Sequence, residues 1–463
     1  MVSRFLYFAC GAASLAACAT YEPAPLAPAS VVQAYRTRSL DLSATLADVQ
    51  RIAPSSQWTG DRWDRLSLFA AALRMNPAIA EARAHVASLD AAAMAAEQGP
   101  PITLTLTAEY AGRATESSPW LYGVASDIPL DFGGRKSSRI DSARFAAMAS
   151  RYDYAEAVWT VRMAVRRAIA EELLTAREVA IGARLADVRA RQVAALERRV
   201  EAGEAIRSDL ERARADTAGD ARRTTDALAR QVAAQITLAE AVGVAPSRLK
   251  DVTPAWDGFD TVTAAALGAD PGDAALLARA DVLRSMAAYD QAESDLGGEV
   301  AKQWPDVHIG PGYTWERGLV KLPFALGLTL PGFDLNRGAI AAAEARREEA
   351  GIHLEAVIAR AQAAVDGALI ERDAARAALT RVRAVDVLTA KRFAAKADEE
   401  LASGAIDRVD WSAAQATQLQ AELAEVDALR RVHAADAALE DALRRPLDGP
   451  ELLIAPQALE TVR

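Results

Sequence analysis

The chain has almost no cysteine. Among its 463 residues, Cys10 and Cys18 are the two cysteines, and both lie close to the N-terminus. The rest of the chain can therefore form neither a disulfide framework nor a cysteine-based metal site. Positive charge is also scarce, because 53 Lys and Arg face 63 Asp and Glu and leave a formal net charge of -10. Such a chain lacks the basic face that binds phosphates, so nucleic acid is excluded as a partner.

The sequence also lacks the short motifs that carry common catalytic chemistry. It contains no Gly-x-x-x-x-Gly-Lys-Ser/Thr phosphate loop, no His-Glu-x-x-His zinc motif and no Gly-x-Ser-x-Gly nucleophile motif. Its four histidines are scattered along the chain, at His85, His308, His353 and His433. We therefore predict no catalytic residue, no metal site and no cofactor, and we expect that the protein is not an enzyme. His308 lies on the polar side of a predicted strand, where it could touch a passing cation, although a solvated wall residue is the simpler interpretation.

The apolar run at the N-terminus is too short to span a bilayer as a permanent helix. It extends from Phe5 to Leu15, follows a short basic start and precedes Leu15-Ala16-Ala17-Cys18. This pattern is typical of a bacterial lipoprotein signal, which is cleaved just before the lipidated cysteine. We predict that residues 1–17 are a signal peptide and that Cys18 carries covalent lipid such as palmitate. By resemblance to lipoproteins in general, Ala19 after the cysteine favours sorting to the outer membrane. The alternative for the whole lipoprotein pattern is a chance Leu-Ala-Ala-Cys in an Ala-rich leader.

The body of the chain contains an internal repeat. Residues 76–84 match residues 272–280, each opening an Ala-rich stretch, and Asp131 and Asp334 follow the second alternating segment of each half, 203 positions apart. Farther on, Gly203 precedes Asp209 by the same spacing as Gly404 precedes Asp410. Each copy is predicted to contain a helix, a β-hairpin, a long helix, a turn and a returning helix.

These landmarks divide the chain after its signal peptide into five parts. We predict a lipidated tether and equatorial segment at 18–65, a first repeat at 66–243 with its hairpin at 102–130, a linker at 244–270, a second repeat at 271–445 with its hairpin at 307–330, and a C-terminal tail at 446–463.

Four segments alternate between apolar and small or polar residues, as strands do when the two faces of a sheet meet different surroundings. Each has about 9 or 10 residues, the length that crosses a bilayer when tilted. They are Ile102–Tyr110, Leu121–Leu130, Val307–Glu316 and Leu322–Leu330. Trp120, Tyr122 and Trp315 lie near one end and Trp304 near the other, as interfacial aromatic residues do. Taken alone, the strands fit a membrane sheet and a sheet on a soluble core equally well.

Two long stretches free of proline, Arg135–Arg199 and Gly338–Leu401, have strong helix composition. Either would reach about 95 Å if straight, which is far longer than a helix that fills a globular core. Apolar residues from Val158 to Leu174 form one stripe on the first helix, and Arg162 and Arg166 lie elsewhere around it. The returning helices, Asp209–Val242 and Asp410–Leu443, complete two antiparallel coiled-coil hairpins per chain.

Four strands cannot close a barrel, whose smallest common size is about 8 strands, and lipid does not tolerate unpaired sheet edges. The chain must therefore oligomerise, and three copies would supply 12 strands. We predict a mainly α protein with a transmembrane β part: a trimeric 12-stranded β-barrel, with four strands per chain, continued by a long α-helical coiled-coil barrel. Pro311 and Pro323 fall within the strands and need positions without a ladder hydrogen bond.

The order and duplicated spacing of these motifs resemble the TolC-like outer membrane efflux family over nearly all of the chain. The stretch Leu328–Gly338 is similar to the branch that serves heavy-metal exporters. The resemblance implies a homotrimer in outer membrane lipid that extends into the periplasm and docks onto a periplasmic adaptor and an inner membrane RND-type pump. It implies a passive duct for small solutes, either metal cations or drugs. A protein-secretion duct of the same fold and a periplasm-spanning structural lipoprotein remain alternatives.

The resemblance also implies a constricted aperture at the helix tips. Its residues here would be Asp410, Asp209, Gly203, Gly404, Asp407 and Arg408. Two other positions of the family pattern differ in this chain, where Ala413 replaces an aspartate and Leu401 a tyrosine. The alternative for Asp410 and Asp209 is that each caps the N-terminus of its returning helix.

Overall fold

The computed structural model describes residues 21–112, 118–250, 252–261, 272–316 and 318–455. The predicted signal peptide and the lipid site at Cys18 lie outside these residues, as do parts of the linker and the tail. The chain divides into two units, residues 1–39 and 40–463. In the first, helix α2 (Pro28–Thr37) begins with a proline, which suits the first turn of a helix. None of the helices within the described ranges combines the length and apolarity needed to cross a membrane.

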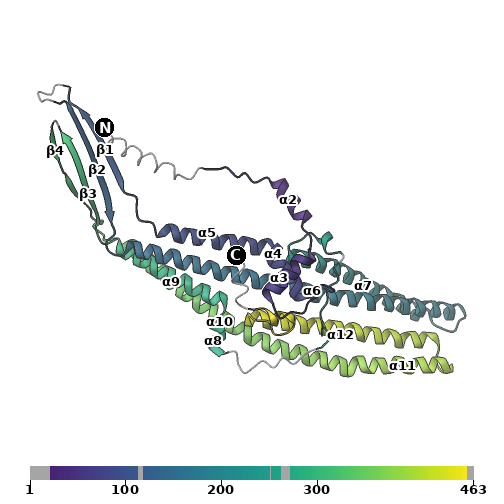
Figure 1. The fold of residues 1–463 in the computed structure, drawn as a ribbon. Helices are drawn as coiled ribbons and strands as arrows, with labels where there is room; N and C mark the ends of the chain where they lie inside the picture. The colour runs from purple at the N-terminus through teal and green to yellow at the C-terminus, as the bar shows by residue number, and fades with distance from the viewer. Residues whose placement is uncertain (1–20, 113–117, 251, 262–271, 317, 456–463) are drawn as a thin grey trace. The chain divides into compact units, whose positions relative to one another are not determined.

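The second unit repeats one series of elements, as the duplication predicted (Figure 1). The series α5, β1, β2, α6, α7 recurs as α9, β3, β4 and β5, α10 and α11, α12. The bounds are α3 Leu42–Ile52, α4 Arg65–Met75, α5 Pro77–Ala96, β1 Thr103–Tyr110, β2 Trp120–Leu130, α6 Arg135–Glu201, α7 Arg207–Val242, η1 Pro246–Arg248, α8 Gly272–Leu277, α9 Ala280–Ala301, β3 Asp306–Glu316, β4 Leu319–Lys321, β5 Phe324–Thr329, α10 Arg337–Arg381, η2 Val382–Val387, α11 Leu388–Ser403, α12 Arg408–Leu443 and η3 Pro450–Leu453.

The two copies of the long helical hairpin match in length. Helix α6 has 67 residues, and α10, the π-helical segment η2 and α11 together cover the same length, while α7 and α12 have 36 residues each. The π-helical turn within the second long helix was not predicted. The match of residues 76–84 to 272–280 is wrong, because the counterpart of α5 is α9, which begins at Ala280. The sequence of an Ala-rich helix still resembles itself after a shift of about two helical turns. The match of the two repeats was displaced by such a shift.

The four alternating segments form one antiparallel sheet with the predicted faces. Pairing in the order β1, β2, β3, β5 places Thr105, Ala125, Gly312 and Pro323 on one face. The fourth segment is divided at Leu322 and Pro323 into β4 and β5. Proline has no N–H to donate, yet the carbonyl of Pro323 still accepts a hydrogen bond from the Gly312 N–H at 2.8 Å.

The other face of this sheet is apolar and exposed. Phe324 is 68% exposed, and Leu106 is 75% exposed. The exposed large side chains on this face are Leu104, Leu106, Tyr110, Trp120, Tyr122, Tyr313, Val320, Phe324, Leu326 and Leu328. Tyr110, Trp120, Tyr122 and Trp315 form a row of ring contacts near the β1–β2 turn, with centroids 4.9 to 6.0 Å apart. The predicted aromatic cluster at one end of the strands is therefore present.

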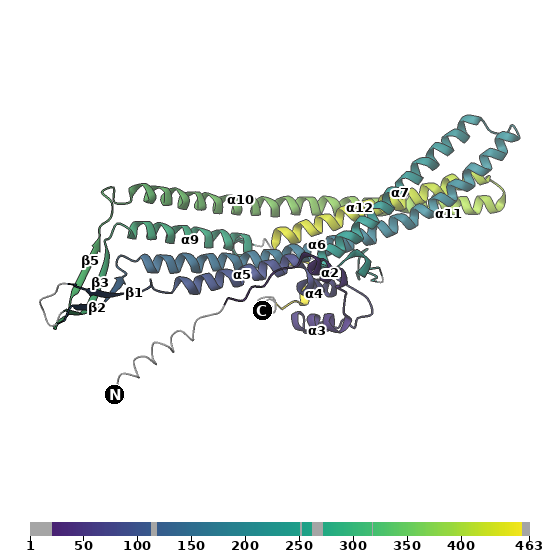
Figure 2. The ribbon, with the colours of Figure 1, turned by 90° about the horizontal axis from the view of Figure 1, so that it is seen from above.

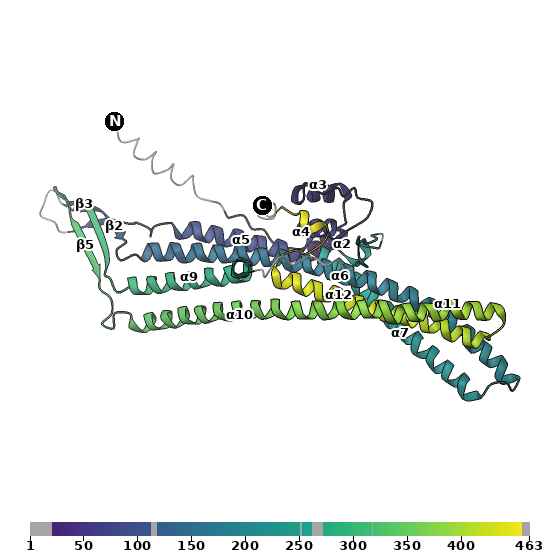
Figure 3. The ribbon, with the colours of Figure 1, turned by 90° about the horizontal axis from the view of Figure 1, so that it is seen from below.

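The sheet continues into a layer of four helices in the same order. Helix α5 leads into β1, β2 leads into α6, α9 leads into β3 and β5 leads into α10. Their neighbours follow this order, since α5 contacts α6, α6 contacts α9 and α9 contacts α10. Figure 3 shows these helices side by side, and Figure 2 shows the two helical hairpins reaching away from the sheet. There α7, α6, α12 and α11 are successive neighbours.

The largest cluster of buried apolar residues lies around α4 and the middle of α6. Helix α4 is almost completely buried against α3, α6 and α7, with Phe69 and Leu73 at its centre. Asp64 and Ser67 form a capping box at its start, in which the Ser67 N–H donates to Asp64 at 2.7 Å. The predicted stripe on α6 is buried here, including Val165 and Ile169.

A buried ion cluster adjoins this core, and it includes two arginines that the helical pattern placed off the buried stripe. Arg162 and Arg166, predicted to lie off the apolar stripe, are buried as deeply as the stripe because α12 and the chain after it cover this side of α6. Glu440 on α12 contacts Arg162 at 3.0 Å and Arg166 at 3.1 Å. The complete cluster consists of Arg65, Arg162, Arg166, Glu440, Asp448 and Glu451.

The segment after α12 completes this cluster. Asp448 contacts Arg65 at 2.9 Å, and Glu451 contacts it at 3.3 Å. Burial raises the pKa of Glu451. Burial opposes ionisation of Asp448 too, but Arg65 and Arg166 hold its pKa below the usual value. The guanidinium of Arg65 also lies 3.9 Å from the ring centre of Trp256, which comes from the linker.

Candidate functional site at the helix tips

Both helical hairpins turn at a glycine with left-handed backbone geometry. Gly203 and Gly404 each have φ of 75°, a conformation that costs side-chain-bearing residues energy. Gly404 is the C-cap of α11, and Gly203 directly follows the C-cap of α6. The predicted turns are therefore present, and glycine is required there by the backbone.

The two returning helices begin differently. Asp407 caps α12, because its side chain accepts hydrogen bonds from the N–H groups of Val409 at 2.7 Å and Asp410 at 3.0 Å. Helix α7 has Ile206 at this position and no side-chain cap. Asp209 and Asp410 lie within the first turns, so the interpretation that they cap these helices is wrong.

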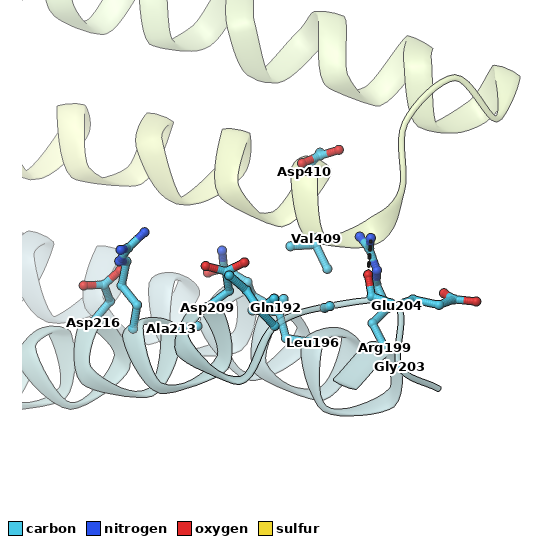
Figure 4. Close-up of a pocket in the computed structure, with 13 residues that line it drawn as sticks. Gln192, Leu196, Arg199, Gly203, Glu204, Asp209, Ala213, Asp216, Val409 and Asp410 are labelled. Carbon is cyan, nitrogen blue, oxygen red and sulfur yellow. Dashed lines mark hydrogen bonds between the residues drawn. The ribbon is translucent and has the colours of Figure 1, made fainter. Parts of the chain in front are cut away.

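An open hollow of about 560 Å³ lies between the two tips (Figure 4). Asp209 from α7 and Asp410 from α12 both line it, so the structure brings together the aspartates of the two repeats. Its lining residues are Gln192, Leu196, Arg199, Gly203, Glu204, Ala205, Ile206, Asp209, Arg212, Ala213, Asp216, Val409 and Asp410. Of the other predicted residues, Gly203 is in the lining, whereas Gly404, Asp407 and Arg408 are not.

The tips are held together by an ion pair and an apolar contact. Arg199, near the end of α6, pairs with the capping residue Asp407 of the other hairpin. Val409 packs against a small cluster formed by Leu196, Leu210 and Ala213. Arg199 was missed by the sequence analysis because nothing in the local pattern relates it to a residue of the second repeat.

The walls of the hollow carry more acidic than basic groups. Glu204, Asp209, Asp216 and Asp410 face Arg199 and Arg212 in the lining. Such a wall attracts cations and repels anions, and it does so without fixed coordination. In the part of the chain that the structure describes, no group of three or more His, Cys, Asp or Glu is arranged to hold a metal ion. The tips therefore carry an open hollow whose lining is mostly acidic.

Comparison with known proteins assigns the family. The model of the family described as "Outer membrane efflux protein" matches residues 68–244 and 272–443. The chain belongs to this family. The TolC-like resemblance seen in the sequence is thereby confirmed, together with the mainly helical fold that carries a small sheet.

The chain is also similar to one characterised relative and to two solved structures. The cobalt-zinc-cadmium resistance protein CzcC of Cupriavidus metallidurans is 26% identical over 224 residues, which are 46% of this chain and 50% of the relative. The chain thus spans about half the length of that relative. The crystal structure of the outer membrane protein VceC from Vibrio cholerae matches with a TM-score of 0.67 at 19% identity, covering 82% of this chain and 96% of VceC. CusC matches with a TM-score of 0.69 at 16% identity, covering 82% and 91%. At these identities the two structures share the fold.

Proposed function

We propose that this outer membrane efflux protein forms one third of a closed tube: a trimeric 12-stranded β-barrel in the outer membrane, continued by a helical barrel into the periplasm. The tube is a passive duct that carries small solutes from an inner membrane RND-type pump to the exterior, through a periplasmic adaptor. The protein catalyses no reaction. The name of CzcC favours metal cations over drugs as the solutes.

The observation that carries this proposal is a sheet that one chain leaves incomplete. Within the described residues, β1 pairs with β2 alone and β5 pairs with β3 alone, so both edges are open. One whole face is apolar and exposed, which water does not favour over so large an area. Lipid would cover that face, but lipid excludes open edges. Pairing of β1 with β5 of another copy satisfies both conditions.

The edges of the helical layer support the same assembly. Helix α7, at one edge, exposes Leu228, Val232 and Ile236 at a spacing of four residues, which places them on one side. The opposite edge exposes apolar residues of α10, η2 and α11, namely Ile370, Val385, Leu388 and Phe393. Two different apolar edges suit a head-to-tail contact between copies, and such contacts close into a ring.

The tips would form the narrowest part of the duct. In this proposal Asp410 and Asp209 line the aperture, and Gly203 and Gly404 form the turns behind them. Asp407 and Arg408 begin α12, and the ion pair between Asp407 and Arg199 supports the position of Asp410. Three copies would bring three such pairs of aspartates around one axis, and carboxylates on an axis favour cations.

The remaining predictions are part of the same proposal. Residues 1–17 would be removed, and lipid on Cys18 would anchor the chain in the outer membrane beside its own barrel. The two repeats, at 66–243 and 271–445, would each supply one hairpin to the barrel and one helical hairpin to the tunnel.

Single-channel recording in planar bilayers tests the duct and its aperture. The purified full-length protein is compared with Asp410→Ala and with Asp226→Ala, a control at an exposed position on α7. We expect discrete openings in all three and a larger conductance or open fraction in Asp410→Ala alone, because three carboxylates leave the aperture. A folded protein that never inserts into membranes would contradict the duct, and equal openings in all three would contradict the role of Asp410.

A further inference from the structure

His308 lies on β3, on the polar face of the sheet. Its register partners are Pro129 on β2 and Gly327 on β5, and Gly310 follows it on the same face. The backbone of Gly327 passes close to it, since a Cβ at that glycine would lie 3.4 Å from the Cβ of His308. With glycines at two of the neighbouring positions, the side chain of His308 remains 33% exposed.

Asp127, on the adjacent strand β2, fixes the orientation of this imidazole. Its Oδ1 lies 3.2 Å from Nδ1 of His308. An ionised carboxylate can only accept a hydrogen bond, so in the neutral imidazole Nδ1 carries the proton and donates it. The other ring nitrogen, Nε2, then bears a lone pair. A histidine held in this way by a carboxylate is the usual arrangement of a histidine that binds a metal ion.

The other described histidines have different surroundings. His433 is buried, and its Nε2 lies 3.0 Å from the carbonyl oxygen of Phe259. Because a carbonyl oxygen only accepts, this Nε2 donates the hydrogen bond. His85 is exposed on α5, and His353 is exposed on α10. His353 therefore offers an internal control for a surface histidine in the same molecule.

We propose that His308, oriented by Asp127, binds borderline divalent cations such as Zn²⁺ and Co²⁺ weakly on the wall of the channel. The inference rests on the proposed function, which turns this face of the sheet toward the channel. Imidazole nitrogen suits these ions, whereas Mg²⁺ prefers oxygen ligands. One protein ligand with water completing the coordination gives a weak site, and weak binding is what conduction needs, because the ion has to leave again.

Chemical footprinting tests the site without any channel activity. The full-length protein in detergent is treated with diethyl pyrocarbonate, which modifies free imidazole nitrogen, and each histidine is followed by mass spectrometry with increasing Zn²⁺. We expect Zn²⁺ to slow modification of His308 and leave His353 unchanged, and Asp127→Asn to require about tenfold more Zn²⁺ for the same protection. Equal modification of His308 with and without millimolar Zn²⁺ would overturn the proposal. Protection unchanged by Asp127→Asn would also overturn it, because Asp127 would then have no part in the site.

Single-channel recording links the site to conduction. We expect Zn²⁺ to produce brief interruptions of the current in the wild type, His308→Ala to abolish them, and Mg²⁺ to produce none in either protein. Interruptions by Zn²⁺ that persist in His308→Ala would contradict the proposal. If no variant conducts at all, the duct itself is contradicted, while the footprinting result still decides whether His308 binds the metal.

Discussion

The buried ion cluster finds its partners within one chain, whereas the sheet has open edges and an exposed apolar face. In the cluster, Arg166 is 1% exposed and Glu440 is 0% exposed, and three arginines meet three carboxylates supplied by α12 and the chain after it. In the sheet, Leu326 is 60% exposed, and both edge strands lack a second partner within the described residues. The cluster thus finds its charged partners within one chain, whereas in the proposed assembly the sheet is completed only by further copies and lipid.

The largest effect is expected from Glu440→Gln. The substitution removes the charge that Arg162 and Arg166 share and leaves a buried guanidinium uncompensated, so we expect a loss of about 3 to 5 kcal/mol in the free energy of unfolding. Thermal unfolding followed by circular dichroism measures it as a lower melting temperature. The control is Glu371→Gln on α10. It breaks an exposed ion pair with Arg431, which lies on α12 as Glu440 does. Equal melting temperatures in the two variants would contradict the distinction.

The next effect concerns pH. Burial, and then Arg166, lower the pKa of His433 from 6.5 to about 4. Between these values the unfolded chain binds a proton that the folded chain rejects, so stability is lost as pH falls from about 6.5 to about 4, by up to about 3 kcal/mol. Melting temperatures of the wild type and of His433→Gln, measured across this range, should diverge on the acid side, with the wild type losing more. Parallel curves would show that His433 does not contribute.

The exposed apolar edge of the helical hairpins is tested by Val232→Ala. Val232 is 57% exposed on α7, and in the proposed trimer it is covered by a neighbouring copy. Removing its two methyl groups should cost about 1.6 kcal/mol at each interface, which weakens each contact between copies about tenfold, and leave subunit folding unchanged. Dilution experiments in detergent, read by light scattering, measure the shift toward smaller particles. Gln231→Ala on the same helix is the control, and an unchanged trimer in Val232→Ala would place that surface outside the interface.

The smallest effect distinguishes the two tips. Asp407→Ala removes the cap of α12, so we expect a local loss of about 1 kcal/mol and faster hydrogen exchange in the first turn. Exchange there should approach that of α7, which has no side-chain cap. Asp407→Asn keeps a capping oxygen and removes the charge that pairs with Arg199, so it separates the cap from the ion pair. Identical exchange in all three proteins would remove Asp407 from both roles.

The predictable parts of this fold are those with a strong local period. Alternation located the strands and their faces, and composition located both long helices and their glycine turns. The π-helical segment Val382–Val387 lies in a stretch that reads as ordinary helix, so its sequence gave no sign of it. The division of the fourth strand at Pro323 had a visible cause, because proline interrupts a ladder.

The features that sequence missed are those made by distant segments. Arg162 and Arg166 read as solvated side chains because a helical pattern shows one buried stripe, while α12 and the chain after it bury a second side. At the tips the sequence located the two glycine turns and the aspartates that follow them, but it could not tell which aspartate caps α12. Asp407 and Asp410 are three residues apart, so the choice depended on where the helix begins.

Cross-linking of the two sheet edges tests the central claim, that three copies of this sheet close one barrel. Thr105→Cys on β1 and Ala325→Cys on β5 lie on the polar face, and a series of bis-maleimide reagents of increasing length covers the possible registers between the two strands. In membranes, the double variant should give a ladder that stops at three subunits, while each single variant gives none. A folded, membrane-inserted protein that does not cross-link, or whose ladder stops at another number, would contradict the trimer.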